Sequence, residues 1–141
     1  MGIPFARSSS ILEVKEKNDI FKQSYSRAGH KEAPDIIVAL HVYLHENEES
    51  AITSARVCYQ RVLDYLGRSR RPGAKVPEFD DMRKEKLVVF SSPERAAETF
   101  HEYENIGVTH IIGMVNFGGV PMPEVRRTME LMSKEIFPKF H

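Results

Sequence analysis

The sequence predicts an α/β protein in which parallel strands form the core. Segments with a helical spacing of apolar residues alternate with short apolar runs along the 141 residues, instead of being grouped by type. Two of these runs, Ile36 to Leu44 and Val108 to Val115, are apolar at nearly every position, which is typical of strands covered on both faces. A chain of this length can form one core, so residues 1–141 are expected to be a single domain.

The first helix is expected over residues 11–28. Its apolar residues lie loosely on one face, and the run ends near Gly29 among cationic side chains, which suit the negative end of a helix dipole. Pro34 then interrupts the chain. The strand from Ile36 to Leu44 follows, and its β-branched and aliphatic residues make it the strongest strand pattern in the sequence.

A long helix is expected from Asn47 to Gly67. Asn47 is a good N-cap, the acidic residues after it suit the positive helix end, and apolar residues recur every three or four positions. Residues 68–81 carry proline and glycine beside basic residues, which indicates a loop. The basic residues are Arg68, Arg70, Arg71 and Lys75. In a neutral chain and without interleaved aromatic residues, they favour a solvated turn over a phosphate or nucleic-acid site.

A shorter strand, Leu87 to Phe90, precedes a helix with a clearly marked start. Ser92 is a preferred N-cap, and Pro93 fits the first helical position. The helix is expected to end at Gly107, because glycine is favoured where the backbone leaves a helix. The second long strand, Val108 to Val115, comes next.

The last helix is expected from Pro123 to Phe140, after the turn Asn116-Phe117-Gly118-Gly119. Its apolar residues recur at steps of four, three, four and four, as one buried helical face requires. They are Val125, Met129, Met132, Ile136 and Phe140. The whole pattern contains four helices and about three strands.

Charge and composition exclude several function classes. Twenty Lys plus Arg balance twenty Asp plus Glu, so no net field draws the chain to nucleic acid or to anionic lipid. No apolar run approaches the roughly 20 residues of a membrane span, and the N-terminus lacks the pattern of an export or lipid-anchor signal. One cysteine, Cys58, cannot form an internal disulfide or a multi-cysteine zinc site, which fits a cytoplasmic protein.

Several segments of the C-terminal half follow a pattern shared with one enzyme family. They are Ser-Pro-Glu at a helix start, Ile106-Gly107-Val108-Thr109-His110 at its end, the strand and turn from Ile111 to Gly119, and a closing Ile136-Phe137-Pro138. With these segments, residues 91–138 resemble the C-terminal end of the luciferase-like, flavin-dependent monooxygenases. A weaker likeness extends back to Gly2-Ile3-Pro4-Phe5. Members of that family are (β/α)8 barrels that bind reduced FMN, or in one branch a deazaflavin, at the C-terminal mouth and activate dioxygen on the flavin.

The resemblance implies only part of a barrel. A complete (β/α)8 barrel takes about 250 residues, so this chain resembles a partial (β/α)8-barrel segment that begins just after the sixth strand, with about three parallel strands and four helices. The earlier strands, which supply most of the flavin pocket in complete members, have no counterpart. Strand edges and apolar faces need cover. We therefore expect completion by oligomerisation, most simply a two-fold dimer, or by a companion chain that supplies the missing strands.

Three polar residues are candidate catalytic residues: His41, Tyr43 and Asn116. Alternation along the first strand puts His41 and Tyr43 on one face and the aliphatic residues on the other. In a barrel this polar face would line the lumen near the C-terminal mouth, where barrel enzymes keep their chemistry. An imidazole there can donate to a flavin carbonyl and move a proton near neutral pH. The alternative is a hydrogen-bonded core histidine.

The candidate cofactor-binding residues are Phe117, Gly118, Gly119, Arg7 and Ser8. Paired glycines allow a ligand to approach the backbone, and amides near a helix N-terminus can receive an anion. A simple tight turn is the alternative. Arg7 and Ser8 can hold a phosphate through a guanidinium and a hydroxyl, or can lie in a solvated loop.

No metal site is expected. The six histidines are scattered, and His41 and His45 lie four positions apart on a strand and its end instead of on one helical face. Cys58 lies among apolar residues of a helix and is expected to be inert.

The resemblance implies an oxidoreductase segment. It would belong to a monooxygenase that uses reduced FMN and dioxygen to oxidise a small organic substrate, and it would be incomplete and inactive as an isolated chain. Two alternatives stay open: a non-catalytic module that associates with itself or with another chain, and a small parallel α/β domain that binds a phosphorylated ligand. Nucleic acid and membranes are not expected partners.

Overall fold

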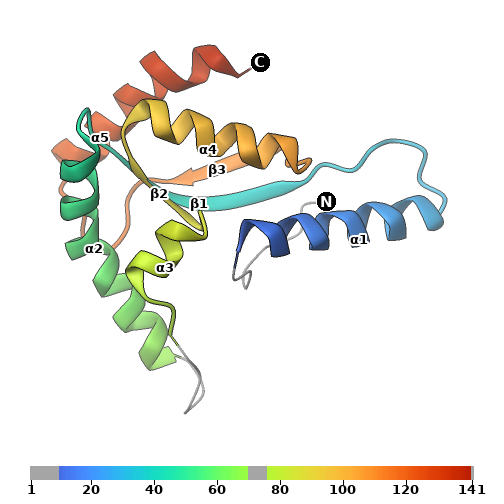
Figure 1. The fold of residues 1–141 in the computed structure, drawn as a ribbon, viewed down its shortest axis with the longest axis horizontal. Helices are drawn as coiled ribbons and strands as arrows, with labels where there is room; N and C mark the ends of the chain where they lie inside the picture. The colour runs from blue at the N-terminus through green and yellow to red at the C-terminus, as the bar shows by residue number, and fades with distance from the viewer. Residues whose placement is uncertain (1–9, 70–75, 141) are drawn as a thin grey trace.

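The computed structural model describes residues 10–69 and 76–140. Helices and strands alternate along it (Figure 1), which confirms the predicted α/β class. In chain order the elements are α1 (Ile11–Arg27), β1 (Ile37–Leu44), α2 (Glu48–Ser69), α3 (Phe79–Lys84), β2 (Val88–Ser91), α4 (Pro93–Asn105), β3 (His110–Met114) and α5 (Met122–Leu131). A π-helical turn (Met132–Ile136) and a 3-10 turn (Phe137–Lys139) follow α5.

Within the described residues, three parallel strands form one sheet in the order β2-β1-β3. The carboxyl half of β1, His41 to Leu44, pairs with β2, whereas Ile37 to His41 pair with β3. Along the chain, β1 and its sheet neighbour β3 are separated by α2, α3, β2 and α4, and α4 itself connects β2 to β3. We call β1, α4, β3 and α5 the regular unit. The elements that lie between β1 and α4 in the chain, namely α2, α3 and β2, are called the excursion.

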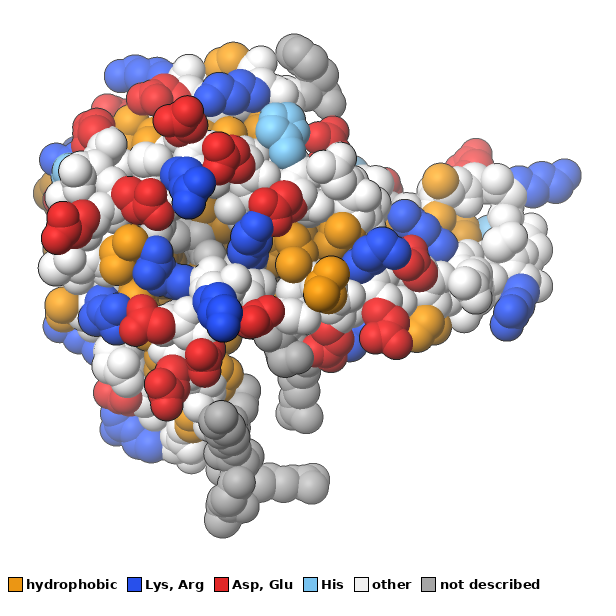
Figure 2. All heavy atoms as spheres, viewed as in Figure 1, with side chains coloured by type: hydrophobic (Ala, Val, Ile, Leu, Met, Phe, Trp, Pro, Cys, Tyr) orange, Lys and Arg blue, Asp and Glu red, His pale blue; other side chains and the backbone are white. Residues whose placement is uncertain are grey.

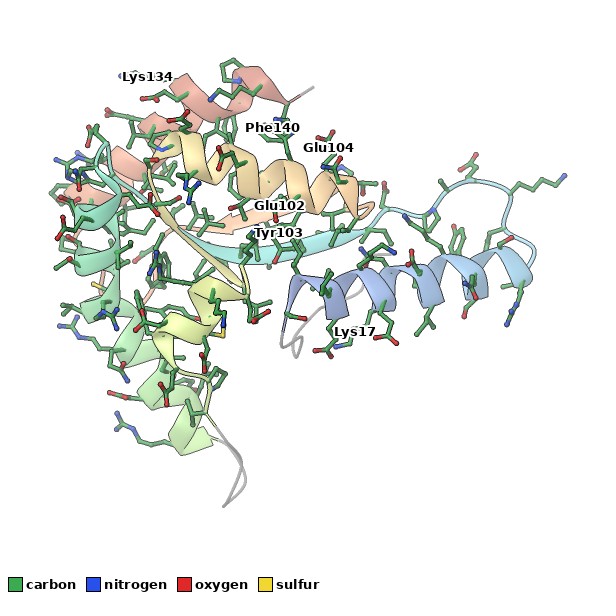
Figure 3. The ribbon with its side chains drawn as sticks, viewed as in Figure 1. Lys17, Glu102, Tyr103, Glu104, Lys134 and Phe140 are labelled. Atoms are coloured by element: carbon green, nitrogen blue, oxygen red, sulfur yellow. The ribbon has the colours of Figure 1, made fainter. Side chains whose placement is uncertain are left out.

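The aliphatic face of β1 forms the centre of the larger core. As the alternation predicts, this face is buried, and residues of α1, α4, α5 and the π turn pack against it. Tyr103 of α4 is fully buried there, and its hydroxyl donates to the carbonyl of Lys86 at 2.7 Å. At the end of the chain, Phe140 lies against α4, with its ring centroid 4.3 Å from that of His101 (Figure 3).

Among the described residues, only those near the carboxyl end of the sheet cover its opposite face. There α2 and α3 bury Tyr43 and Phe90 in a second cluster that is rich in aromatic rings. Farther along the same face, Ile112 is 55% exposed and Met114 is 37% exposed. This uncovered area is called the open face below. It consists of Ile37, Ala39 and His41 on β1 and their partners His110, Ile112 and Met114 on β3.

Two expectations about helices are wrong. The segment 68–81, which its composition predicts as a loop, runs into helix α3, so the described chain has five α-helices instead of four. Acidic residues in the first turn and basic residues in the last suit the dipole of α3, and Phe79 is buried against Phe90. The last α-helix also ends at Leu131 instead of Phe140. The wider π turn that follows keeps Ile136 buried, and Pro138 has no amide hydrogen to continue a helix.

The predicted helix ends are confirmed where side chains mark them. The Ser92 hydroxyl accepts from the amide of Arg95 at 3.4 Å, and Asn47 Oδ1 accepts from the amide of Ser50 at 3.0 Å. Gly107 follows α4 with a φ of +85°, a conformation that glycine adopts without steric cost.

Helix α1 extends beyond the other helices of the molecule (Figure 1). Val14 and Asn18 are buried, and Asn18 Nδ2 donates to the carbonyl of Ile106 at 3.3 Å, whereas Leu12 and Ile20 are exposed. Only part of α1 therefore contacts the core. Neither α1 nor any other helix of the described ranges is long and apolar enough to cross a membrane.

Candidate functional site

His41 lies where the aromatic cluster meets the open face. It pairs in register with buried Val88 on one side and with half-exposed Met114 on the other. The rings of Tyr59 and Phe117 meet the imidazole edge-on, each with a centroid 5.1 Å away. The imidazole is therefore held in place by two rings and is only partly covered.

The surroundings of His41 keep its imidazole neutral. Burial lowers the pKa of His41 from its ordinary value, so the uncharged form predominates at pH 7. No residue of the described chain hydrogen-bonds to its ring. A neutral imidazole has one nitrogen that donates and one that accepts, so both functions remain available to a ligand on the open face.

Tyr43 shares the face of His41 but is committed to another contact. Its hydroxyl donates to Glu124 Oε2 at 2.9 Å, and Arg127 Nη1 donates to the same oxygen at 3.0 Å. Burial is the main cause that raises the pKa of Tyr43. With 2% of its surface exposed, Tyr43 connects the carboxyl end of β1 to α5, and its hydroxyl already has a carboxylate partner.

Asn116 and Phe117 follow β3 but differ in burial. Asn116 is exposed, and none of the described residues hydrogen-bonds to its side chain. Phe117 is buried, touches His41 edge-on and stacks on Phe90 with centroids 5.5 Å apart. Of the residues that the sequence selects, the structure thus brings His41 and Phe117 into direct contact.

The paired glycines allow a close approach, but to the protein itself. Gly118 and Gly119 have φ values of +54° and +75°. A Cβ atom on Gly118 would lie 1.9 Å from the carbonyl oxygen of Cys58 in α2. Arg61 Nη1 also donates to the Gly118 carbonyl at 2.9 Å. The packing of this turn on α2 therefore explains why residue 118 is a glycine. The predicted phosphate residues Arg7 and Ser8 lie outside the described residues.

Tyr59 is part of the site, although the sequence analysis does not select it. It is 1% exposed, contacts the rings of His41, Phe90 and Phe117, and has a pKa that burial raises to about 12. In the sequence it is only one apolar residue of a helical face. No pattern along the chain shows that this face of α2 packs on the sheet beside His41.

The chemistry of the described residues offers no metal centre. They contain no group of three or more His, Cys, Asp or Glu side chains that could hold a metal ion. Cys58 is a free, buried thiol in α2. The site is therefore an imidazole set in an aromatic and apolar surround.

Comparisons with known proteins show the fold of this chain. No family model matches the sequence, and no curated protein matches it. Its structure is similar to that of the monooxygenase RslO1 from Streptomyces bottropensis, with a TM-score of 0.79 and 19% identity, over 99% of this chain and 41% of that one. It is also similar to the coenzyme F420 dependent tetrahydromethanopterin reductase from Methanopyrus kandleri, with a TM-score of 0.68 and 18% identity, over 99% of this chain and 45% of that one.

The chain thus spans less than half the length of both solved structures. Its α/β arrangement, with three parallel strands in the described residues, matches part of each of them. The partial-barrel architecture that the resemblance implies is therefore confirmed as a fold. At these identities the likeness extends to the fold alone.

Proposed function

We propose that this chain is part of a luciferase-like oxidoreductase that uses a flavin or a deazaflavin, and that the open face is one wall of the cofactor site. The position of His41 carries the proposal. A neutral imidazole without a hydrogen-bond partner among the described residues lies beside exposed apolar side chains. It lies in the carboxyl half of β1, toward the end of the sheet where barrel enzymes place their chemistry. The two similar structures are named as a monooxygenase and as a coenzyme F420 dependent reductase, and these names support the same class of oxidoreductase.

The residues present fit the ring system of such a cofactor. Ala39, Ile112 and Met114 offer an apolar sheet surface, and Phe117 borders it. Ligand sites are lined mainly by apolar and aromatic groups of this kind. Arg61 is the cation at the glycine turn, but its guanidinium already donates a hydrogen bond to the Gly118 carbonyl, so we do not assign it to a phosphate group. We infer that a phosphate group is held by residues outside the described part or by another chain.

A bound reduced flavin would supply electrons for hydride transfer or for the activation of dioxygen. The role of His41 is to donate a hydrogen bond to the ligand and to hold or pass a proton at a ring nitrogen. Ile112 and Met114 exclude water from the ring, and the exposed amide of Asn116 can orient a small organic substrate. Tyr43 positions the carboxyl end of β1 through Glu124. The family resemblance implies FMN with dioxygen for this proposal, or a deazaflavin as in one branch of the family.

The first prediction concerns the affinity of the chain for FMN. An open face leaves much of the ligand in water, so we expect dissociation constants no tighter than about 10 μM. Quenching of flavin fluorescence during a titration measures the affinity. We expect His41→Ala to weaken it by about threefold or more, since the ring supplies both a polar partner and an aromatic edge.

His101→Ala is the matched control, because His101 lies on α4 against Phe140 and away from the open face. It should leave quenching unchanged. A stoichiometric yellow complex with the monomeric chain would contradict the incomplete site. Equal quenching by the wild type and by the His41→Ala variant would contradict the placement of the cofactor at His41.

A second candidate function is a non-catalytic association module. It is favoured by the exposed side chains of Ile112 and Met114, and by the outer edges of β2 and β3, which pair with no other strand of residues 10–69 and 76–140. Such surfaces need a partner. The two functions differ in one measurement. A chain that oligomerises and shows no saturable FMN or deazaflavin binding is the module, whereas binding that depends on His41 supports the oxidoreductase.

A further inference from the structure

The outer edge of β2 borders a groove that the proposed cofactor site does not use. The groove has a volume of about 230 Å³. It is lined by Val88–Ser91, by Arg83 and Lys86 before the strand, by Arg95, Glu98, Thr99 and Glu102 of α4, and by Glu48 of α2. We propose that this groove docks an extended polypeptide segment of alternating acidic and basic residues, which joins the sheet as a further strand beside β2. The groove and the open face are lined by different residues, so the inference does not depend on the function proposed above.

The backbone of β2 supplies the first argument. The carbonyl of Ser91 accepts from the amide of His45, which follows β1, at 3.3 Å. Successive residues of an extended strand direct their backbone groups to opposite sides, so Ser91 and Val89 face β1, and Val88 and Phe90 face the groove. β2 pairs only with β1 in the described sheet. The N–H and C=O groups of Val88 and Phe90 are therefore ready to pair with an added strand, as in β-strand addition.

The walls of the groove supply the second argument, because they differ in charge. Arg83 belongs to α3, on the side of the sheet to which Val88 and Phe90 turn their side chains. Glu98 and Glu102 belong to α4, on the other side, where Arg95 of the same helix also lines the groove beside Glu98. The α4 wall therefore carries two carboxylates and one cation. Figure 2 shows that acidic and basic side chains are intermingled over the face where Figure 1 draws α3 and α4.

The side chains of an added strand would alternate between these walls. Residues that point to the α3 wall would meet Arg83, which favours acidic side chains. Residues that point to the α4 wall would meet Glu98 and Glu102, which favours basic side chains. Charge complementarity thus selects a segment in which acidic and basic residues alternate.

Ion pairs within the chain lie at both ends of the groove, and the charged side chains of a bound segment would compete with them. Lys86 pairs with Glu102, the α4 residue labelled in Figure 3. At the other end, Arg95 lies 3.3 Å from Glu98 and 3.8 Å from Glu48. These side chains are 37–60% exposed. Exposed pairs contribute only about 0–1 kcal/mol, so an incoming charged segment can replace them.

The test uses a fluorescein-labelled hexapeptide of alternating Glu and Lys, with blocked ends, and the full chain. Fluorescence anisotropy should show saturable binding, with a dissociation constant of about 0.1–1 mM for so short a ligand. Glu98→Lys should weaken binding about fivefold or more, because it reverses the charge of the α4 wall. Glu94→Lys makes the same change on the same helix outside the groove and should have little effect.

Two further measurements locate the peptide. In ¹⁵N-resolved NMR spectra, the amides of Val88 and Phe90 should shift and exchange more slowly when the peptide binds. A hexapeptide with three Glu followed by three Lys has the same composition and should bind much more weakly. Equal binding of both peptides, no effect of Glu98→Lys, or shifts confined to β3 would overturn the proposal. The proposal also fails if Val88 and Phe90 shift when the protein concentration alone is raised, since a second copy then occupies the edge.

Discussion

The imidazole of His41 lies at the boundary between a packed aromatic cluster and a face open to solvent. Its orientation follows from strand alternation, and the sequence predicts it correctly. Its surroundings do not follow from β1, because Tyr59 comes from α2 and Phe117 from the turn after β3. The burial that lowers the pKa of His41 is therefore a product of packing between distant segments.

Gly118 shows a similar limit at the scale of one residue. A glycine pair after a strand is compatible with a ligand loop and with a tight turn, and the sequence leaves both open. The structure places the carbonyl of Cys58 where a Cβ atom of residue 118 would lie. The requirement for glycine comes from α2. Along the chain, this helix is separated from the turn by four elements, α3, β2, α4 and β3.

We predict that Gly118→Ala destabilises the fold by about 2–5 kcal/mol, the sum of left-handed strain and overpacking. Urea unfolding followed by circular dichroism measures the loss. Gly29→Ala is the matched control: Gly29 has a φ of +88° but nothing within 4 Å of a Cβ position. It should lose only the strain, about 1–2 kcal/mol. Equal losses of stability in the two variants would mean that the contact with α2 contributes nothing to the effect of Gly118→Ala.

At the scale of elements, the chain consists of a regular unit and an excursion. The regular unit is β1, α4, β3 and α5, and its strands and capped helices carry clear sequence patterns. The excursion of α2, α3 and β2 is harder to predict because α3 is short. Six residues cannot show a helical periodicity, and α3 is stabilised by charges at its ends and by the burial of Phe79. Composition therefore favours a loop where a helix forms.

Ser92→Ala is predicted to lower the stability by about 1 kcal/mol and to leave FMN binding unchanged. The Ser92 hydroxyl accepts from the amide of Arg95 at the start of α4, on the side of the sheet away from the open face. A lower urea midpoint with an unchanged slope is the expected result. Ser133→Ala, at an exposed position in the π turn, is the control and should have the wild-type midpoint. If the midpoint of Ser92→Ala does not move, the hydroxyl does not stabilise the helix start.

At the scale of the whole molecule, coverage of the sheet is uneven. Helices cover the aliphatic face, but the open face and the outer edges of β2 and β3 have no partner in the described chain. Both similar structures have more than twice the aligned length, since the match covers 41% and 45% of them. Uncovered apolar sheet surface of this kind favours association.

We predict that the folded chain is a two-fold dimer through the open face, with His41, Met114 and Asn116 at or near the contact. Tyr43 belongs to the same predicted set, but α2 already buries it within one chain. Sedimentation equilibrium at micromolar concentration should give twice the chain mass of 16.2 kDa. Ile112→Lys should give monomers, because it places a charge on the apolar contact.

Met129→Lys is the control for that experiment, since Met129 is equally exposed (55%) but lies on α5. It should leave the dimer intact. A monomeric wild type that unfolds cooperatively would show that the open face is stable in water. A companion chain would then have to be sought by its ability to restore flavin binding to the monomer.

The sequence by itself determined the class of the fold, the strands, most helix ends and the face on which His41 lies. These features depend on local rules: the period of apolar residues, the chemistry of caps and the alternation of side chains along a strand. Tertiary structure alone decided that β1 lies between β2 and β3, that Tyr59 and Phe117 flank His41, and that Gly118 packs on α2. Each of these depends on which distant segments meet, and no spacing within a single segment contains that information.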